Sequence, residues 1–230
     1  MLVGARNPLN IGAAARAMSN FGFRHLRVVN PNRLAFREAR SAVGASALLA
    51  SAEEYRSVAE AVADCVLVVG TTAVGHRQLR HPLRRLEQGA RVIRKQLGSG
   101  RVALVFGSEK VGLSNLDLGH CHWLMRISTG DAHSSMNLGQ AVAVCLYELV
   151  RNGKAKGRSE TQRRATAGEL ERITTTLLDA LQISGYLKPG ASASTEERVR
   201  RLVRRLNLPA DDSELWLGML RQIAWKLRTL

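Results

Sequence analysis

Three turns rich in glycine and asparagine carry the side chains with the clearest chemical potential. They span residues 6–16 (RNPLNIGAAAR), 106–115 (FGSEKVGLSN) and 134–140 (SSMNLGQ), and each follows an apolar run. None of them combines a carboxylate pair, a set of metal ligands, or a nucleophile beside a base. The pattern therefore predicts a site built mainly from backbone, glycine and amide groups, which suits a neutral or cationic cofactor.

The first turn places Asn10 and Arg16 six residues apart across the start of a helix. Asparagine is a typical helix cap, so the side chain of Asn10 is expected to bond the first unpaired backbone N–H groups. The N–H groups at such a helix start can face an anion or a hydroxyl. Arg16 follows further along the helix, where it is either an exposed arginine on an alanine-rich surface or a residue of the site.

The second turn contains Gly107, Glu109 and Gly112, but it matches neither of the common phosphate-binding patterns. It lacks the Lys-Ser/Thr pair of a P-loop, and its spacing differs from the G-x-G-x-x-G of a dinucleotide site. Glu109 is therefore interpreted either as a surface carboxylate or as a partner that holds Arg16.

The third turn contains Ser134, Ser135 and Asn137 at the start of the longest apolar helix pattern. Hydroxyl and amide side chains at that position are ordinary helix caps. Each turn is weak evidence by itself, and the informative feature is the order and spacing of all three in one chain.

The cysteines and histidines do not indicate a metal site. Cys65, Cys121 and Cys145 lie in apolar surroundings, so we interpret them as buried thiols in a reducing cytoplasm. His120 and His122 flank Cys121, but neighbouring residues on a strand point to opposite faces. The chain also lacks an apolar run near the ~18 residues of a membrane span, and it lacks a secretory signal pattern. We therefore expect a cytoplasmic protein with no metal and no membrane partner.

The charge balance indicates a polyanionic partner. The chain has 34 Lys and Arg residues against 19 Asp and Glu residues, a formal net charge of +15. An excess of this size, mostly arginine, favours RNA or DNA as the partner. Aromatic residues make up only 4% of the chain, which argues against a protein that binds single strands by stacking bases on aromatic side chains.

The first half of the chain alternates apolar runs with helical patterns. Strands are expected at 2–5, 26–29, 65–69, 102–106 and 123–127, and helices at 11–21, 51–63, 83–97 and 137–150. This alternation predicts an α/β fold with a parallel sheet covered on both faces. The three turns would then be loops of that sheet, which is where such sheets bind ligands.

The last third of the chain has a different composition. A polar, glycine-rich stretch is typical of a linker, and three helices with Ser/Thr/Asp-x-x-Glu openings follow at Thr166, Ser194 and Asp211. We predict an α/β domain over 1–152, a linker over 153–165, and a small all-α C-terminal domain over 166–230. The helical domain would bind RNA or support a dimer.

One of these helices is unusually rich in arginine. Its arginines follow one another at helical spacing: Arg198, Arg200, Arg201, Arg204 and Arg205. They form either a solvated helix face or a face that contacts phosphates, and the overall charge favours the second interpretation at least as much as the first.

These residues resemble the SpoU/TrmH branch of the SPOUT RNA methyltransferases. The first family motif corresponds to Asn10, Gly12 and Arg16, the second to residues 104–115, and the third to residues 134–139. The likeness covers residues 3–150, and the tail is similar to that of enzymes that methylate nucleotide 32 in the anticodon loop of tRNA. One departure is the short first strand, Met1 to Ala5, since relatives usually carry several more residues there; the strand is either short or preceded by a missed start.

The resemblance implies a deep trefoil knot, a homodimer, and S-adenosyl-L-methionine bound within the knot. Knotted folds are rare, so this expectation rests on the likeness alone. The residues that the likeness assigns to the cofactor, many of them through backbone groups, are Thr71, Thr72, Ala73, Gly107, Ile127, Ser134, Ser135 and Met136.

The resemblance also implies the reaction, in which a ribose 2′-hydroxyl of tRNA attacks the methyl group of the cofactor. We expect Arg16 to stabilise the developing alkoxide, because a guanidinium with a pKa above ~12 is a poor base. Glu109 would orient Arg16. The hydroxyl would be positioned by Asn10, Ser135 and Asn137. The alternatives are methylation of ribosomal RNA or of another tRNA position, and a non-catalytic knotted RNA-binding protein.

Overall fold

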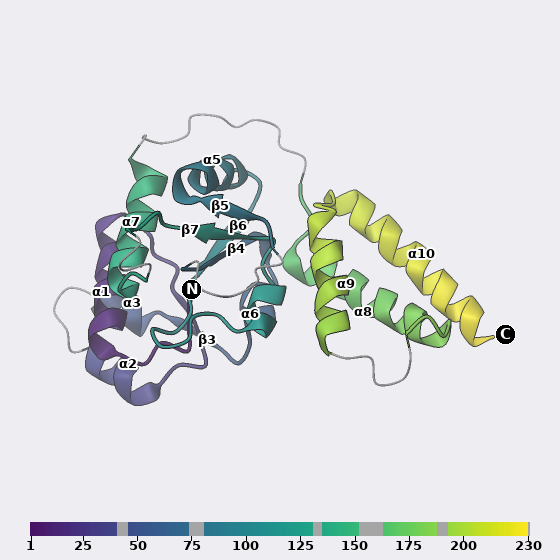
Figure 1. Ribbon diagram of the computed structural model, residues 1–230, viewed down its shortest axis with the longest axis horizontal. Coiled ribbons are helices and arrows are strands. Elements are labelled where there is room, and N and C mark those ends of the chain that lie inside the picture. The colour runs from purple at the N-terminus through teal and green to yellow at the C-terminus, as the bar shows by residue number, and fades with distance from the viewer. Residues whose placement is uncertain (41–45, 74–80, 131–134, 152–162, 188–192, 230) are drawn as a thin grey trace.

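The computed structural model describes residues 1–40, 46–73, 81–130, 135–151, 163–187 and 193–229. An α/β body carries a helical tail at one side (Figure 1). Ser134 and most of the expected linker lie outside the described residues. Within the described ranges, no helix has the length and apolar content needed to cross a membrane.

Parallel strands form the centre of the body. They are β1 (Leu2–Val3), β2 (Arg27–Val29), β3 (Glu53–Tyr55), β4 (Cys65–Thr71), β5 (Leu83–Arg85), β6 (Arg101–Val105) and β7 (Trp123–Arg126). Two sheets have the orders β1-β2-β3 and β5-β7-β4-β6, and every strand pair is parallel. A parallel bridge between Leu2 and Phe106 connects the first sheet to the second. The predicted parallel α/β fold is therefore confirmed.

Helices cover both faces of the sheet, as expected for parallel strands. One face packs against α1 (Pro8–Asn20), α2 (Arg33–Arg40), α3 (Ser46–Ala50), α5 (Leu86–Gln96) and α7 (Leu138–Val150). The other packs against α4 (Val58–Ala61), α6 (Asn115–Gly119) and the start of α8 (Ala167–Ile183). Alternate residues of β4 supply the two cores: Leu67 and Val69 belong to the first, and Val68 belongs to the second.

Two predicted helices are wrong in part, because strand pairing determines the local structure. Residues 51–63 were expected to form one helix, but the backbone N–H of Glu53 donates to Leu26 O (2.9 Å) and β3 pairs with β2. Helix α4 begins only after Ser57, whose side chain accepts from Glu60 N. Residues 83–97 likewise begin as strand β5, paired with β7. Pairing with a neighbouring strand has outweighed helix propensity in both segments.

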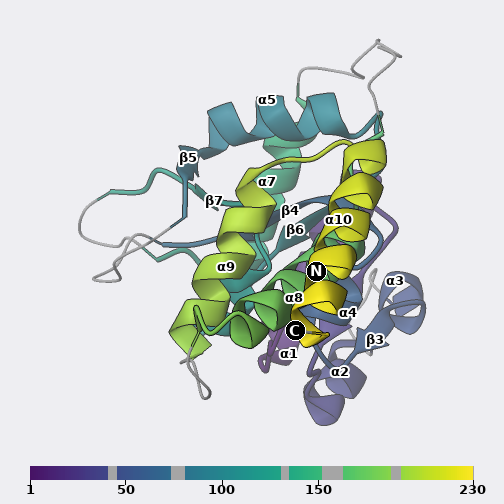
Figure 2. The ribbon, with the colours of Figure 1, turned by 90° about the vertical axis from the view of Figure 1, so that its right-hand side faces the viewer.

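The tail consists of three described helices, α8, α9 (Ala193–Arg205) and α10 (Ala210–Arg228), as Figure 2 shows from the side. The capping box predicted at Thr166 is present, since Thr166 and Glu169 exchange hydrogen bonds. The other two predicted boxes are wrong. Helix α10 is capped by Pro209, which places Asp211 inside the first turn, and Ser194 lies within α9.

The arginines of α9 do not form a single exposed face, so both interpretations of this helix need correction. The side chain of Arg204 is only 2% exposed, and those of Arg200 and Arg201 are 13% and 11% exposed. Arg198 and Arg205 are exposed. Arg204 is therefore buried and Arg200 and Arg201 are largely covered, because α9 packs against α8 and α6.

A charged cluster ties the two sheets together at the amino ends of their strands. Arg27 on β2 donates to both oxygens of Asp64 (2.5 and 2.8 Å) and, through Nε, to Glu53 on β3 (3.2 Å). Arg101 on β6 also donates to Asp64. Hydrogen bonds from Arg27 hold the pKa of Asp64 well below its usual range.

We expect Asp64→Asn to lower the free energy of unfolding by about 1 kcal/mol at pH 7, because a partly exposed charge cluster contributes little more. The folded-state pKa of Asp64 is depressed, so its contribution is complete above the unfolded pKa of about 3.9 and is lost as the pH falls. Urea unfolding at pH 7 and at stepwise lower pH would measure the difference. Glu54→Gln, which changes an exposed carboxylate on β3, is the control. If the wild type and Asp64→Asn differed in free energy of unfolding by the same amount in acid as at pH 7, the depressed pKa of Asp64 would be contradicted.

Candidate functional site

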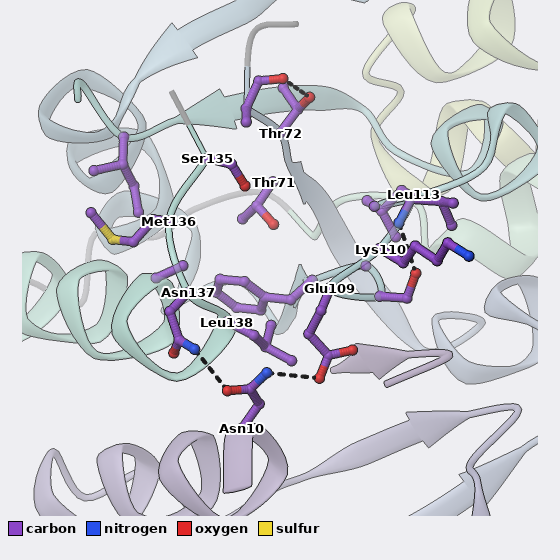
Figure 3. A pocket seen from close by; sticks show the side chains of 18 of the residues that line it. Asn10, Thr71, Thr72, Glu109, Lys110, Leu113, Ser135, Met136, Asn137 and Leu138 are labelled. Atoms are coloured by element: carbon purple, nitrogen blue, oxygen red, sulfur yellow. Dashed lines mark hydrogen bonds between the residues drawn. The ribbon is translucent and has the colours of Figure 1, made fainter. Parts of the chain in front are cut away.

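A pocket of about 520 Å³ lies at the carboxyl ends of β4, β6 and β7 (Figure 3). Its walls come from the end of β4 and the segments that follow the three strands, 71–73, 106–113 and 127–129, and from 135–138. Parallel sheets commonly bind ligands at this edge, and the volume is typical of small-molecule sites.

The described residues expected to hold the cofactor all line this pocket: Thr71, Thr72, Ala73, Gly107, Ile127, Ser135 and Met136. Two of the hydroxyls are engaged locally, since Thr71 Oγ1 donates to Val105 O (2.9 Å) and Thr72 Oγ1 donates to Ala73 O (3.1 Å). These two hydroxyls are therefore already engaged within the protein. Ser134, the remaining expected contact, lies outside the described residues.

The second turn folds back on itself so closely that its first residue must be glycine. A Cβ atom at Gly107 would overlap the backbone of Gly112 and Leu113. Gly112 has a φ of +70°, and its N–H donates to Ser108 O (2.9 Å). The two glycines therefore allow the tight loop and bring backbone groups to the wall of the pocket.

A chain of amide hydrogen bonds connects the three turns at the mouth of the pocket (Figure 3). Asn137 Nδ2 donates to Asn10 Oδ1 (2.7 Å), and Asn10 Nδ2 donates to Glu109 Oε1 (3.1 Å). Glu109 also accepts from the backbone N–H groups of Arg6 and Asn7, both at 3.3 Å. Side chains from segments about a hundred residues apart in the sequence are thus held in one arrangement.

Glu109 is an ionised acceptor in this arrangement. Burial raises the pKa of its carboxyl, but hydrogen bonds from its own backbone, from Asn10 and from the N–H groups of Arg6 and Asn7 outweigh burial. They hold the pKa of Glu109 below its usual range. A carboxylate with this pKa orients donors at neutral pH and is poorly suited to act as a general acid.

The expectation that Asn10 caps the first helix is wrong. Asn7 is the cap, because its Oδ1 accepts from Leu9 N (2.9 Å) and Pro8 occupies the first helical position. Proline favours that position, since it has no N–H to leave unpaired and its φ suits a helix. Asn10 therefore lies within the first turn, and its amide is available to connect Glu109 with Asn137.

Arg16 occupies a different position from the other expected catalytic residues. Asn10, Glu109, Ser135 and Asn137 line the pocket, whereas Arg16 is not among the described residues that do. It is exposed on α1, on the helix surface that also carries Leu9 and Ala13. The family resemblance grouped Arg16 with the other four residues because Arg16 shares the first motif with Asn10.

Several lining residues were not assigned from the sequence: Phe106, Ser108, Lys110, Val111, Gly112, Leu113, Leu118, Thr129, Leu138 and Ala141. Most of them belong to the second turn, whose fold-back could have been suspected from its two glycines. Leu118 and Thr129 had no comparable signal, because their place depends on how the loops cross in three dimensions.

The two histidines beside Cys121 contact other parts of the protein and do not form a metal site in the described residues. His122 Nδ1 accepts from Val68 N (3.1 Å), and burial lowers the pKa of His122 to about 3. His120 instead faces the tail, with its Nδ1 3.4 Å from Arg204 Nη2. In the parts of the chain that the structure describes, no group of three or more His, Cys, Asp or Glu side chains is arranged to hold a metal ion.

Comparison with known proteins identifies relatives along nearly the whole chain. Residues 1–147 match the model of the SpoU rRNA Methylase family. The tRNA (cytidine/uridine-2′-O-)-methyltransferase TrmJ of Photorhabdus laumondii is 32% identical over 230 residues, which covers 97% of this chain and 95% of that protein.

Solved structures agree with these sequence matches. The crystal structure of TrmJ from Z. mobilis ZM4 is 33% identical, covers 96% of each chain and has a TM-score of 0.81. The SpoU methyltransferase AviRb from Streptomyces viridochromogenes, solved in complex with the cofactor AdoMet, is 23% identical, covers 68% of this chain and 57% of that chain, and has a TM-score of 0.51; it shares the fold. Because the family model matches more than half of the sequence and the relatives match almost all of it, this chain belongs to the SpoU methylase family.

Proposed function

We propose that this protein transfers a methyl group from S-adenosyl-L-methionine to a ribose 2′-hydroxyl of tRNA in the cytoplasm, at nucleotide 32 of the anticodon loop. The observation that carries the proposal is the pocket at the carboxyl edge, walled by three turns that Asn10, Glu109 and Asn137 connect. The names of the relatives support the reaction and the tRNA substrate. The net charge of +15 supports a nucleic-acid partner.

The residues of the pocket fit this cofactor. Its walls combine backbone groups of the second turn with the side chains of Ile127, Met136 and Leu138. Such walls can surround an adenosine group and a short aliphatic chain without acids or metal ligands. When bound, S-adenosyl-L-methionine supplies a methyl group on a sulfonium, which is already a good leaving group. The protein's task is then to hold two reactants in line.

The side chains at the mouth of the pocket would position the ribose. Asn137 and Ser135 lie where the third turn meets the pocket, and Asn10 holds the amide of Asn137 in a fixed orientation. These polar groups can hydrogen-bond the incoming hydroxyl and align it. Arg16 would stabilise the alkoxide as charge develops and would bind an adjacent phosphate, because a guanidinium remains charged throughout.

A homodimer would explain why Arg16 does not line the pocket of its own chain. On α1 it shares a surface with Leu9, which is 80% exposed, and α7 beside it exposes Tyr147 (54%) and Val144 (37%). The two helices pack closely, since a Cβ at Gly139 would lie 2.6 Å from that of Ala13. We infer that a second copy covers this surface and that each Arg16 serves the partner's pocket.

The knotted path and the division into domains belong to the same proposal. Strand β7 lies between β4 and β5 although it follows both of them, and β6, in the chain. This late insertion of β7 between earlier strands agrees with the knotted path that the family resemblance implies. A separate core formed by Ala165, Leu170, Ile173, Val203 and Leu220 supports a helical domain within 166–230, joined to residues 1–152 by a linker over 153–165.

Ribosomal RNA is the second candidate substrate, because the matching family model carries that description. Mapping of 2′-O-methyl groups in all RNA from a strain that lacks the protein would decide between them. Loss of one tRNA methylation, restored by the wild-type gene, is the expected result. Loss of a ribosomal methylation would instead identify ribosomal RNA as the substrate. An unchanged methylation map, together with no cofactor binding, would favour the non-catalytic RNA-binding protein.

Gly107→Ala is expected to abolish detectable binding of S-adenosyl-L-methionine in calorimetry. The added methyl group overlaps the backbone of Gly112, so the second turn must open. Gly98→Ala is the matched control, because a Cβ there meets nothing within 4 Å. Normal cofactor binding by folded Gly107→Ala protein would show that the cofactor lies elsewhere.

Arg16→Ala is expected to lower kcat by about 100-fold, the usual effect of removing one charge-stabilising donor. Arg16→Lys should keep part of the activity, with no added rise as the pH increases from 7 to 9. Activity of Arg16→Lys that climbs as lysine deprotonates would instead identify a general base at this position. Arg24→Ala, an exposed arginine after α1, is the control; near wild-type turnover by Arg16→Ala would remove Arg16 from the site.

A further inference from the structure

Helix α6 lies between the cofactor pocket on one side and the helical tail on the other. Leu118 on α6 and Leu113 just before it line the pocket, and both are nearly buried. The helix has five residues and one capping box, formed by Ser114 and Asp117. A helix this short has little stability by itself, so its position depends on what packs against each side.

The tail packs directly on the outer side of α6. A Cβ added at Gly119 would lie 3.9 Å from both Arg200 Cδ and Glu197 Cγ of α9. His120, which caps the C-terminal end of α6, is 6% exposed and has its Nδ1 3.8 Å from Glu171 Oε2. Helix α9 and the start of α8 therefore enclose the end of α6.

A partly buried charge cluster of the tail lies against this contact: it joins α9 to Glu171 on α8, and both Arg204 and Glu171 face His120 at the end of α6. Arg200 Nε donates to both oxygens of Glu171 (2.9 and 3.1 Å), and Arg204 Nη2 donates to Glu171 Oε2 (3.1 Å). Burial, and after it the charge of Arg204, lower the pKa of His120 to about 4, so His120 is neutral beside the arginine at pH 7. Arg204 thus has one carboxylate partner and one neutral ring as neighbours.

Burying this charge cluster between two surfaces carries a large desolvation free energy. Among the described residues, Arg204 Nε and Nη1 are buried without a hydrogen-bond partner. A packed apolar side chain would avoid that cost, so the cluster contributes little net stability for the desolvation it requires. The planar guanidinium of Arg204 instead gives the contact a defined geometry, because the same Nη2 meets Glu171 of α8 and His120 at the end of α6.

A second contact joins the tail to the strand beside the pocket. The N–H of Gly168, in the first turn of α8, donates to Ala63 O (2.9 Å), and a Cβ at Gly168 would lie 3.0 Å from that oxygen. Ala63 precedes β4, whose last residue, Thr71, lines the pocket. The tail thus contacts the scaffold of the pocket at two separate points.

We propose that Arg204 and Glu171 are positioning residues for the cofactor pocket: by joining α9 to α8 around His120 at the end of α6, they hold Leu113 and Leu118 in place against the bound cofactor. This inference rests on the proposed cofactor. It makes the tail a part of the methyl-donor site, whereas an RNA-binding appendage would leave cofactor affinity unchanged.

Calorimetry with S-adenosyl-L-methionine and the full-length chain tests the proposal. Arg204→Ala is expected to raise the Kd by about fivefold, a typical coupling between linked sites. The KM for the cofactor should rise with it, while kcat at saturating cofactor stays near the wild-type value. Arg205→Ala, the exposed neighbour on the same helix, is the matched control and should leave the Kd unchanged.

A second pair of variants separates the contact from the charge. Gly119→Leu would push Arg200 and Glu197 away from α6, and should raise the Kd as Arg204→Ala does. Gly119→Ala places its Cβ at ordinary contact distance and should bind normally. Thermal unfolding identifies folded variants. Wild-type affinity in folded Arg204→Ala or Gly119→Leu protein would overturn the inference, whereas failure of the wild-type chain to bind the cofactor would overturn the proposed function with it.

Discussion

The pairing of β4 with both β6 and β7 is the constraint on which the site depends. Val69 is in register with Leu104 on one side and with Trp123 on the other. Because all three strands are parallel, the loops that follow them leave the sheet at the same edge. Two further features then shape the pocket. Gly107 and Gly112 let the second turn fold back on itself, and the amides of Asn10 and Asn137 connect the turns.

The chemistry at this edge uses few charged side chains because the proposed donor needs little activation. Glu109 is the carboxylate at one end of the amide chain, and its hydrogen bonds keep it ionised as an acceptor. The amide of Asn10 connects that carboxylate to Asn137, so the geometry of the first turn is transmitted to the third. Orientation, more than acid–base chemistry, is what such a network supplies.

The arginine helix illustrates why charge patterns on a sequence must be tested against burial. Spacing alone puts Arg204 and Arg205 side by side on one helix, and both interpretations of the pattern left them exposed. In the structure Arg204 is buried against His120 while Arg205 is exposed. Neighbours on a helix differ by about 100° in direction, so one can face a packed domain while the next faces water.

The sequence by itself determined the parallel α/β class and the three turns, because these follow from local periodicity and turn chemistry. The resemblance to the family named seven described residues that line the pocket. It misassigned the cap at Asn10 and the helix at 51–63, where a neighbouring proline or strand outweighed local preference. Only the tertiary structure decided that Arg16 lies outside its own pocket, that Leu118 lines it, and that Arg204 reaches the body. Each of these depends on contacts between distant segments, and no local pattern encodes which segments meet.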